Sequence, residues 1–266
     1  CGTDTIVETT TYLKMILGPN CPFSVITVGA MKPTGEESSD AIPNMQKAFE
    51  HLHNLHKHNP PLATVAMRVE GGLYDPTKTR KMHSDIAAAF DGEKLIDTET
   101  FEGIQMNAHK FHQVKEEDYD KPYEEALILR CANQVQFVPP ELSDDPFKYE
   151  DMVRKSEAKA IVIETYASYT YPTNILGAIA RAANGRPIFV INSIEETGET
   201  VSHDYEPTVA MAQLGMYPCR LTKHAITAKI NYGLSLFGNN TEQLVDFITK
   251  NDFVGEQYKG FQSFPS

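Results

Sequence analysis

The sequence Gly2-Thr3-Asp4-Thr5 leads directly into an apolar helix pattern over residues 6–17. Thr5 and Glu8 have the Ser/Thr-x-x-Glu spacing of a capping box, in which each side chain satisfies a free backbone N–H of the other residue. Thr3 and Asp4 are then additional polar groups just outside a helix N-terminus, where the helix dipole and free N–H groups favour anions. Alternatively, they only assist helix entry, because Thr and Asp are favoured N-cap residues.

Strand and helix patterns alternate along the rest of the chain. The β-branched run at residues 24–30 predicts a buried strand, and the strand at 62–69 turns at Gly71-Gly72 into a hairpin that carries Lys78. We expect further strands at 126–129, 160–166 and 187–192, and helices through 45–55 and at 149–156, 173–183, 207–214, 222–236 and 242–248. This alternation predicts parallel sheets covered by helices, with ligand sites at the carboxyl ends of strands, as at Gly29-Ala30 and residues 166–170.

Residues 105–124 lose this periodicity and gather charge, which is typical of a linker between domains. We therefore expect an N-terminal domain at 1–111, a linker at 112–124 and a C-terminal domain at 125–266. Residue 1 is Cys rather than Met, so we also expect the first element of the fold to precede this sequence.

Composition excludes several classes of protein. The 266 residues carry a net charge of −12, which argues against a nucleic-acid or anionic-membrane surface. No apolar run approaches the roughly 18–20 residues of a membrane span. The four cysteines are far apart and form no metal-binding spacing, so reduced thiols in a cytoplasmic protein fit better than a disulfide framework.

A threonine hydroxyl is a poor nucleophile unless a base takes its proton. A lysine whose pKa is lowered by burial can act as that base, and a carboxylate can orient it. Thr3, Asp4 and Lys78 provide these three groups, although the spacing alone does not bring Lys78 to Thr3 and an exposed hairpin lysine is the commoner case.

Other polar residues have simpler interpretations. His51, His53, His56 and His58 lack an i, i+4 pair, so a solvated helix end is favoured over a zinc site. Glu164 at a strand end is either catalytic or structural, and Cys219 lacks a recognisable His partner and fits a packed thiol.

Several segments together resemble the bacterial-type L-asparaginase/glutaminase family, whose motifs HGTDT-xxET, VGAMRP, SADG and TKT occur in this order. The matching segments are Gly2-Thr3-Asp4-Thr5 with Glu8-Thr9, Val28-Gly29-Ala30-Met31-Lys32-Pro33, Ser38-Ser39-Asp40 and Thr77-Lys78-Thr79. The distal half is also similar, in residues 205–218 and the helix pattern at 222–236. The resemblance implies two α/β domains, each a mainly parallel sheet flanked by helices, with a larger N-terminal domain that is truncated here and a smaller Rossmann-like C-terminal domain.

The resemblance also implies a role for each matching residue. Thr3 corresponds to the second catalytic threonine, which positions or activates the attacking water. Asp4 corresponds to the residue that binds the substrate's α-ammonium group, and Lys78 to the cation beside Thr3. Gly2 corresponds to a residue close to the substrate, and the Ala30 carbonyl to a contact of the side-chain amide. The implied reaction is hydrolysis of L-asparagine to L-aspartate and ammonia through an acyl-enzyme on a threonine, with no metal or cofactor.

The chain departs from the family pattern at three places. The family's first catalytic threonine belongs to a TGGT strand that would precede residue 1, and Cys1 stands where the family usually has His. The family's GxGN turn, which lends an Asn to a neighbouring subunit, aligns with residues 167–170, so Thr170 becomes the inter-subunit candidate.

These departures leave alternatives beside an active homodimeric or homotetrameric asparaginase. One is a catalytically silent binding or assembly protein of this fold, and another is the amidase subunit of a tRNA-dependent amidotransferase. The choice between L-Asn and L-Gln also stays open, because one methylene gives only about 1–3 kcal/mol of discrimination.

Overall fold

The structure is a computed structural model that describes residues 2–84, 89–100, 103–106, 108–119, 134–140, 142–166, 169–192 and 206–258. It divides the chain into two compact units, Cys1–Leu127 with Phe253–Glu256, and Ile128–Asp252 with Gln257–Ser266. None of the described helices is long and apolar enough to cross a membrane.

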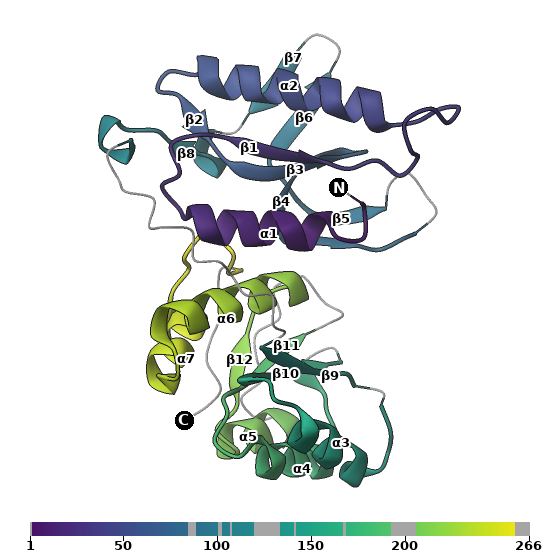
Figure 1. Ribbon diagram of the computed structural model, residues 1–266, viewed down its shortest axis with the longest axis vertical. Helices are drawn as coiled ribbons and strands as arrows, with labels where there is room; N and C mark the ends of the chain where they lie inside the picture. Colours follow the sequence, from purple (N-terminus) through teal and green to yellow (C-terminus); the bar gives the residue numbers. More distant parts are fainter. Residues whose placement is uncertain are drawn as a thin grey trace. The chain divides into compact units, whose positions relative to one another are not determined.

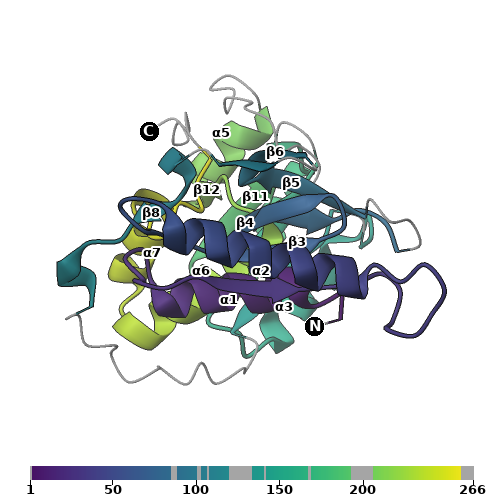
Figure 2. The same cartoon turned by 90° about the horizontal axis from the view of Figure 1, so that it is seen from above.

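The first unit is built on a mixed four-stranded sheet of order β1-β3-β4-β5, formed by β1 (Val25–Val28), β3 (Val65–Val69), β4 (Gly72–Lys81) and β5 (Phe90–Lys94). β1 and β3 are parallel, whereas β3, β4 and β5 are joined as antiparallel neighbours. Helices α1 (Ile6–Leu17) and α2 (Ala41–Lys57) cover opposite faces of this sheet (Figure 1). Seen from above, α2 lies over the stretch of sheet that α1 covers from the other side (Figure 2).

Two small antiparallel pairs complete the described part of the first unit. β2 (Leu62–Ala63) pairs with β8 (His112–Gln113), and β6 (Ile96–Thr100) pairs with β7 (Gly103–Met106). The short helices η1 (Ala108–Lys110) and η2 (Glu116–Asp118) flank β8. Strand pairing in this unit thus continues past residue 111, and residues 120–133 lie outside the described residues, so the exact domain limits stay a prediction.

The second unit contains a parallel sheet of order β12-β11-β10-β9, formed by β9 (Val135–Val138), β10 (Ala160–Thr165), β11 (Ile188–Asn192) and β12 (Tyr217–Cys219). Helices α3 (Pro146–Lys155), α4 (Thr173–Ala183) and α5 (Glu206–Gln213) lie on one side of it, and α6 (Lys223–Phe237) and α7 (Thr241–Lys250) lie on the other (Figure 1). Ile161, Val162 and Ile163 of β10 are completely buried, as expected for a parallel strand covered on both faces.

The α/β class and the two-domain arrangement are confirmed, and most predicted elements are present within one to four residues of their expected ends. The strand expected at 126–129 lies outside the described residues, whereas β9 and the three-residue β12 were not predicted.

The predicted capping box is wrong. Thr5 is the N-cap but caps no backbone N–H, because its hydroxyl donates to the Gly2 carbonyl at 3.3 Å.

A sharp irregularity interrupts β4 between Tyr74 and Thr79, where its register with β5 shifts from Tyr74↔Lys94 to Thr79↔Gly92. Asp75 organises this bend. Its Oδ1 accepts hydrogen bonds from Thr77 N at 3.0 Å and Thr77 Oγ1 at 2.7 Å, and its carbonyl accepts one from Thr79 Oγ1 at 2.6 Å. Gly92 is required opposite the bend, because a Cβ there would lie 2.4 Å from the Lys78 carbonyl oxygen.

Asp75 also connects the bend to α1, because Lys14 Nζ lies 2.9 and 2.7 Å from its two carboxylate oxygens. Burial alone would raise the pKa of Asp75, but the Lys14 ion pair and the hydrogen bonds from Lys14 and Thr77 outweigh it and hold this pKa below its ordinary value of 3.8. A carboxyl with a lowered folded-state pKa stabilises the fold above its unfolded pKa, and this stabilisation is lost as the pH falls through the folded pKa.

We therefore expect Asp75→Asn to lower the free energy of unfolding at pH 7 by about 3 kcal/mol, because it leaves Lys14 without its carboxylate. As the pH is lowered below about 4, we also expect the free energy of unfolding to fall less in the variant than in the wild type. Urea unfolding across this range measures both effects. If the free energies of unfolding of the two proteins fell in parallel as the pH is lowered, Asp75 would not be the group that provides this stabilisation.

Candidate functional site

The start of α1 and the end of β4 meet at one cluster of polar side chains. Lys81 Nζ donates hydrogen bonds to Thr3 Oγ1 at 2.9 Å and to Asp4 Oδ1 at 2.7 Å. The Lys81 side chain is only 16% exposed, whereas the Asp4 side chain is 86% exposed. The cluster thus combines a hydroxyl, a sheltered amine and a carboxylate that is open to solvent at a helix N-terminus.

Lys81, and not Lys78, is the lysine that reaches Thr3. We expected Lys78 to be the cation beside Thr3, but Lys78 Nζ instead forms an ion pair with Glu93 of β5, at 3.0 Å. Arg80 pairs with Asp91 on the same strand, so Lys78 and Arg80 share one face of β4. Thr79 and Lys81 belong to the opposite face, because successive side chains of a strand alternate.

Strand alternation identifies Lys81 once the structure shows which residues of β4 face inward. Thr77 and Thr79 are completely buried, and alternation from Thr79 predicts that Lys81 continues the inner face while Lys78 leaves it. Our prediction followed the Thr77-Lys78-Thr79 motif instead and therefore chose a lysine on the wrong face.

The carboxyl end of β1 lies against the same cluster. Gly29 has no side chain at a point where a Cβ would lie 2.8 Å from Ile6 Cδ1, 3.3 Å from Val69 Cγ1 and 3.8 Å from Thr3 Cγ2. Glycine therefore allows the strand end to approach the start of α1 closely. This approach places Ala30, the next residue, near the start of α1 and the turn before it that contains Thr3 and Asp4.

The loop around Ala30 is fixed from both sides by Asp40 and Asn44. Asp40 accepts hydrogen bonds from the backbone N–H of Met31 at 3.1 Å and of Lys32 at 3.0 Å. Buried Asn44 donates from Nδ2 to the Gly29 carbonyl and to Asp40 Oδ2, each at 3.0 Å. The peptide groups on either side of Ala30 are therefore held in place, which fixes the direction of its carbonyl.

We expect Asp40→Ala to lower the free energy of unfolding by about 1–3 kcal/mol, because it leaves the Met31 and Lys32 amides and part of Asn44 without their acceptor. The change should also weaken any activity that depends on the Ala30 carbonyl. Urea unfolding and substrate turnover measure the two effects. Asp151→Ala removes a carboxylate from an exposed ion pair of α3 and serves as the control. Equal stabilities of the Asp40 and Asp151 variants would contradict the bracing role.

Comparison with known proteins gives a family match for the N-terminal part of the chain. Residues 1–113 match the family model described as "Asparaginase, N-terminal". This domain belongs to the asparaginase family. Comparison with curated protein sequences gives no significant match.

Solved structures extend the likeness to nearly the whole length of the chain. The thermostable L-asparaginase from Thermococcus kodakarensis is 19% identical with a TM-score of 0.73, over 98% of this chain and 75% of that one. L-asparaginase I from Vibrio cholerae is 20% identical with a TM-score of 0.74, over 97% of this chain and 74% of that one. At these identities the comparison shows a shared fold.

Two other predicted residues of the asparaginase-like site lie outside the cluster's direct contacts. The Gly2 carbonyl accepts hydrogen bonds from the backbone N–H of Thr5 and Ile6, so Gly2 sits in the turn that begins α1. Thr170 belongs to the second unit, after β10, where its carbonyl accepts a hydrogen bond from Tyr166 N at 3.1 Å. Its contact with a neighbouring subunit stays a prediction.

The remaining candidates have structural surroundings. His51 is buried in α2, whereas His53 and His56 are exposed, and no group of three or more His, Cys, Asp or Glu in the described part of the chain could hold a metal ion. Glu164 forms an ion pair with Lys223. Burial raises the pKa of the Cys219 thiol to about 12, so this cysteine is a protonated, packed thiol at neutral pH.

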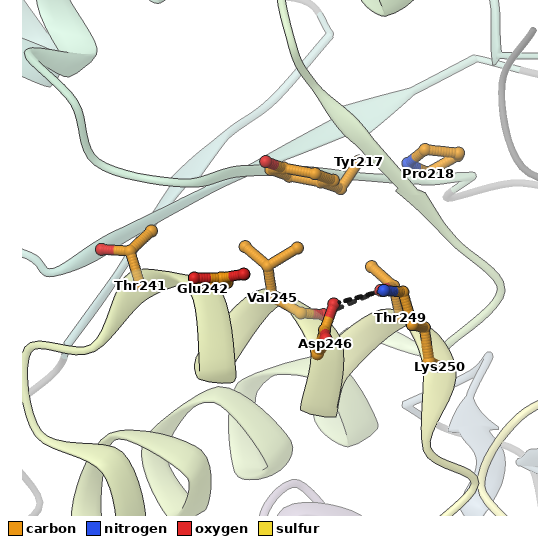
Figure 3. A pocket seen from close by; sticks show the side chains of 8 residues that line it. All are labelled: Tyr217, Pro218, Thr241, Glu242, Val245, Asp246, Thr249 and Lys250. Carbon is orange, nitrogen blue, oxygen red and sulfur yellow. Dashed lines mark hydrogen bonds and ion pairs between the residues drawn. The ribbon is translucent and has the colours of Figure 1, made fainter. Parts of the chain in front are cut away.

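A cavity of about 720 Å³ lies in the second unit between β12 and α7. Tyr217 and Pro218 form one wall, and α7 forms the other, where Asp246 and Lys250 are joined by an ion pair (Figure 3). None of its lining residues belongs to the predicted site, and we assign it no role in the chemistry.

Proposed function

We propose that this protein is an amidohydrolase that hydrolyses the side-chain amide of L-asparagine to L-aspartate and ammonia. The observation that supports this proposal most directly is the contact of Lys81 with Thr3 and Asp4 at the start of α1, within a domain of the asparaginase family. The two structural relatives, both L-asparaginases, support the same activity.

In this proposal Asp4 binds the α-ammonium group of the substrate. Its carboxylate is largely exposed, and charge-assisted hydrogen bonds of an ammonium to a carboxylate are among the stronger ones in proteins. Lys81 already neutralises one side of this carboxylate and limits the directions from which a second cation can approach. The substrate's amine thereby becomes oriented relative to Thr3.

Thr3 and Lys81 would then act on the water that completes the reaction. The 2.9 Å separation between Thr3 Oγ1 and Lys81 Nζ is within the range for proton transfer when the amine is neutral. Thr3, relieved of its proton in this way, can in turn accept a proton from the attacking water. The oxygen of this water adds to the acyl carbon, and the bond from that carbon to the oxygen of the acylated threonine breaks. The proton taken from the water passes back through Thr3 and Lys81 to that leaving oxygen, and L-aspartate is released.

We place the acyl-enzyme on a threonine of the family's TGGT strand, a motif that is not among these 266 residues. Among the described strands β1 lies at the edge of its sheet, next to β3, and all four of its residues are only half-buried. A parallel strand added at the other edge of β1 would end beside Ala30, because parallel strands share one carboxyl edge. Attack of its threonine oxygen on the amide carbon would form the ester and break the C–N bond, and the hydroxyl proton would pass to the leaving nitrogen, which is released as ammonia.

Ammonia release by the purified protein with L-Asn and L-Gln at matched concentrations, together with its intact mass, tests the proposal. Turnover that Lys81→Met abolishes would support it, and the ratio of the two rates would identify the substrate. No turnover by a protein that carries the TGGT strand would favour a catalytically silent binding protein. Turnover that appears only with a second protein chain would indicate an amidotransferase subunit.

The assembly and location of the protein belong to the same proposal. We propose a homodimer or homotetramer in the cytoplasm that needs no cofactor, because the family completes its sites across subunits and Thr170 aligns with the residue that does so. Light scattering of the purified protein measures its assembly, and a stable monomer with full activity would contradict a shared site.

A further inference from the structure

α1, together with the turn that precedes it, contacts β4 through charged groups at two separate points. One is the cluster of Lys81 with Thr3 and Asp4, at the end of β4. The other is the ion pair of Lys14 with Asp75, at the first residue of the bend in β4. The side chains of Lys14 and Asp75 are only 15% and 9% exposed, so this pair is far better shielded than the exposed pairs of α3.

The bend determines which side chain of β4 reaches the start of α1. Between Tyr74 and Thr79 β4 advances five residues while β5 advances two, so the last residues of β4 follow a path set by the bend. Asp75 stabilises this backbone path, because its Oδ1 accepts hydrogen bonds from Thr77 and its carbonyl accepts one from Thr79. Lys14 binds the same carboxylate and fixes it to α1, the helix that begins just after Thr3 and Asp4.

We propose that Lys14 and Asp75 are positioning residues that hold the bend of β4 against α1 and thereby keep Lys81 within hydrogen-bond distance of Thr3. Neither residue touches the Thr3 cluster, so each acts through the backbone between it and the site. The proposal rests on the proposed function only for its effect on turnover. The placement of Lys81 is a separate property that can be measured in an inactive protein.

The first test measures the accessibility of each lysine by trace labelling with acetic anhydride, read by peptide mass spectrometry in the folded protein. We expect Lys14→Met and Asp75→Asn to raise the labelling rate of Lys81 several-fold, because its amine loses its fixed partners. Lys47, which lies in an exposed ion pair of α2, should label at an unchanged rate. Lys155→Met and Asp151→Asn break an exposed pair of equal length, 2.7 Å, and serve as matched controls.

The second test separates kcat from KM for ammonia release. Misplacement of a reacting group by about 1 Å can cost about 100-fold in rate, so we expect kcat to fall by about ten- to a hundredfold in both variants. Lys14→Arg keeps a cation with two hydrogen-bond donors facing the Asp75 carboxylate, and this variant should retain most of the wild-type kcat. A purely structural role would lower thermal stability but leave the labelling rate of Lys81 and kcat at the wild-type values below the unfolding temperature.

Unchanged labelling of Lys81 in folded Lys14→Met and Asp75→Asn proteins would overturn the proposal, whatever their activity. If either variant fails to fold, Thr77→Val takes its place, because it removes one hydrogen bond to Asp75 and keeps both charges. It should raise Lys81 labelling by a smaller factor, and an unchanged rate would equally contradict the proposal. A wild-type protein without amidohydrolase activity would contradict the proposed function alone, since labelling still reports on Lys81.

Discussion

Replacement of Lys81 by Met is expected to lower kcat for ammonia release by about 10²–10⁴-fold, the contribution that is typical of a positioned proton-transfer group. Met has a similar length and shape but no amine, so both the 2.9 Å contact with Thr3 and the 2.7 Å contact with Asp4 are lost. The fold should remain, because the Lys81 amine contacts two residues at a solvent-exposed helix start. Steady-state kinetics and circular dichroism measure the two results.

Lys78→Met is the matched control for this experiment. Lys78 is on the same strand and has a similarly sheltered side chain, but it pairs with Glu93 on the other face. We expect this variant to keep most of the wild-type kcat and to lose at most about 1 kcal/mol of stability. Should Lys78→Met abolish turnover while Lys81→Met preserves it, the assignment of the catalytic lysine would be wrong.

Replacement of Thr3 by Val is expected to have an effect of similar size on kcat. Val keeps the branched shape of Thr, including the methyl group that lies near Gly29, and removes only the hydroxyl. The loss therefore isolates the group that accepts the hydrogen bond from Lys81. Because Thr3 would act on the attacking water, acyl-enzyme should accumulate, and intact-mass spectrometry after rapid quenching would detect it as a covalent adduct.

Thr9→Val is the control for this second substitution. Thr9 is an exposed residue of α1 six positions after Thr3, so removal of its hydroxyl changes the helix surface without touching the cluster. We expect wild-type kcat in this variant. A Thr3→Val protein with unchanged kcat and no covalent adduct would contradict the proposed role of the Thr3 hydroxyl.

The sequence alone predicted the parts of this protein that depend on local patterns. The apolar periodicity of residues 173–183 gave the bounds of α4, and the β-branched runs around Val162 and Val190 predicted two central strands, because burial on both faces requires nearly continuous apolar residues. The position of Thr3 and Asp4 before α1 was also predicted from the sequence, since helix starts have a local signature.

Only the tertiary structure decided which groups meet at the site. Lys81 reaches Thr3, and Lys78 does not, because the bend at Asp75 shifts the register of β4 against β5 and strand alternation then places the two lysines on opposite faces. The strand β12 was missed because three residues carry no measurable period. The bend is fixed by contacts between residues as distant as Lys14 and Asp75, and such long-range contacts leave no periodic trace in the sequence.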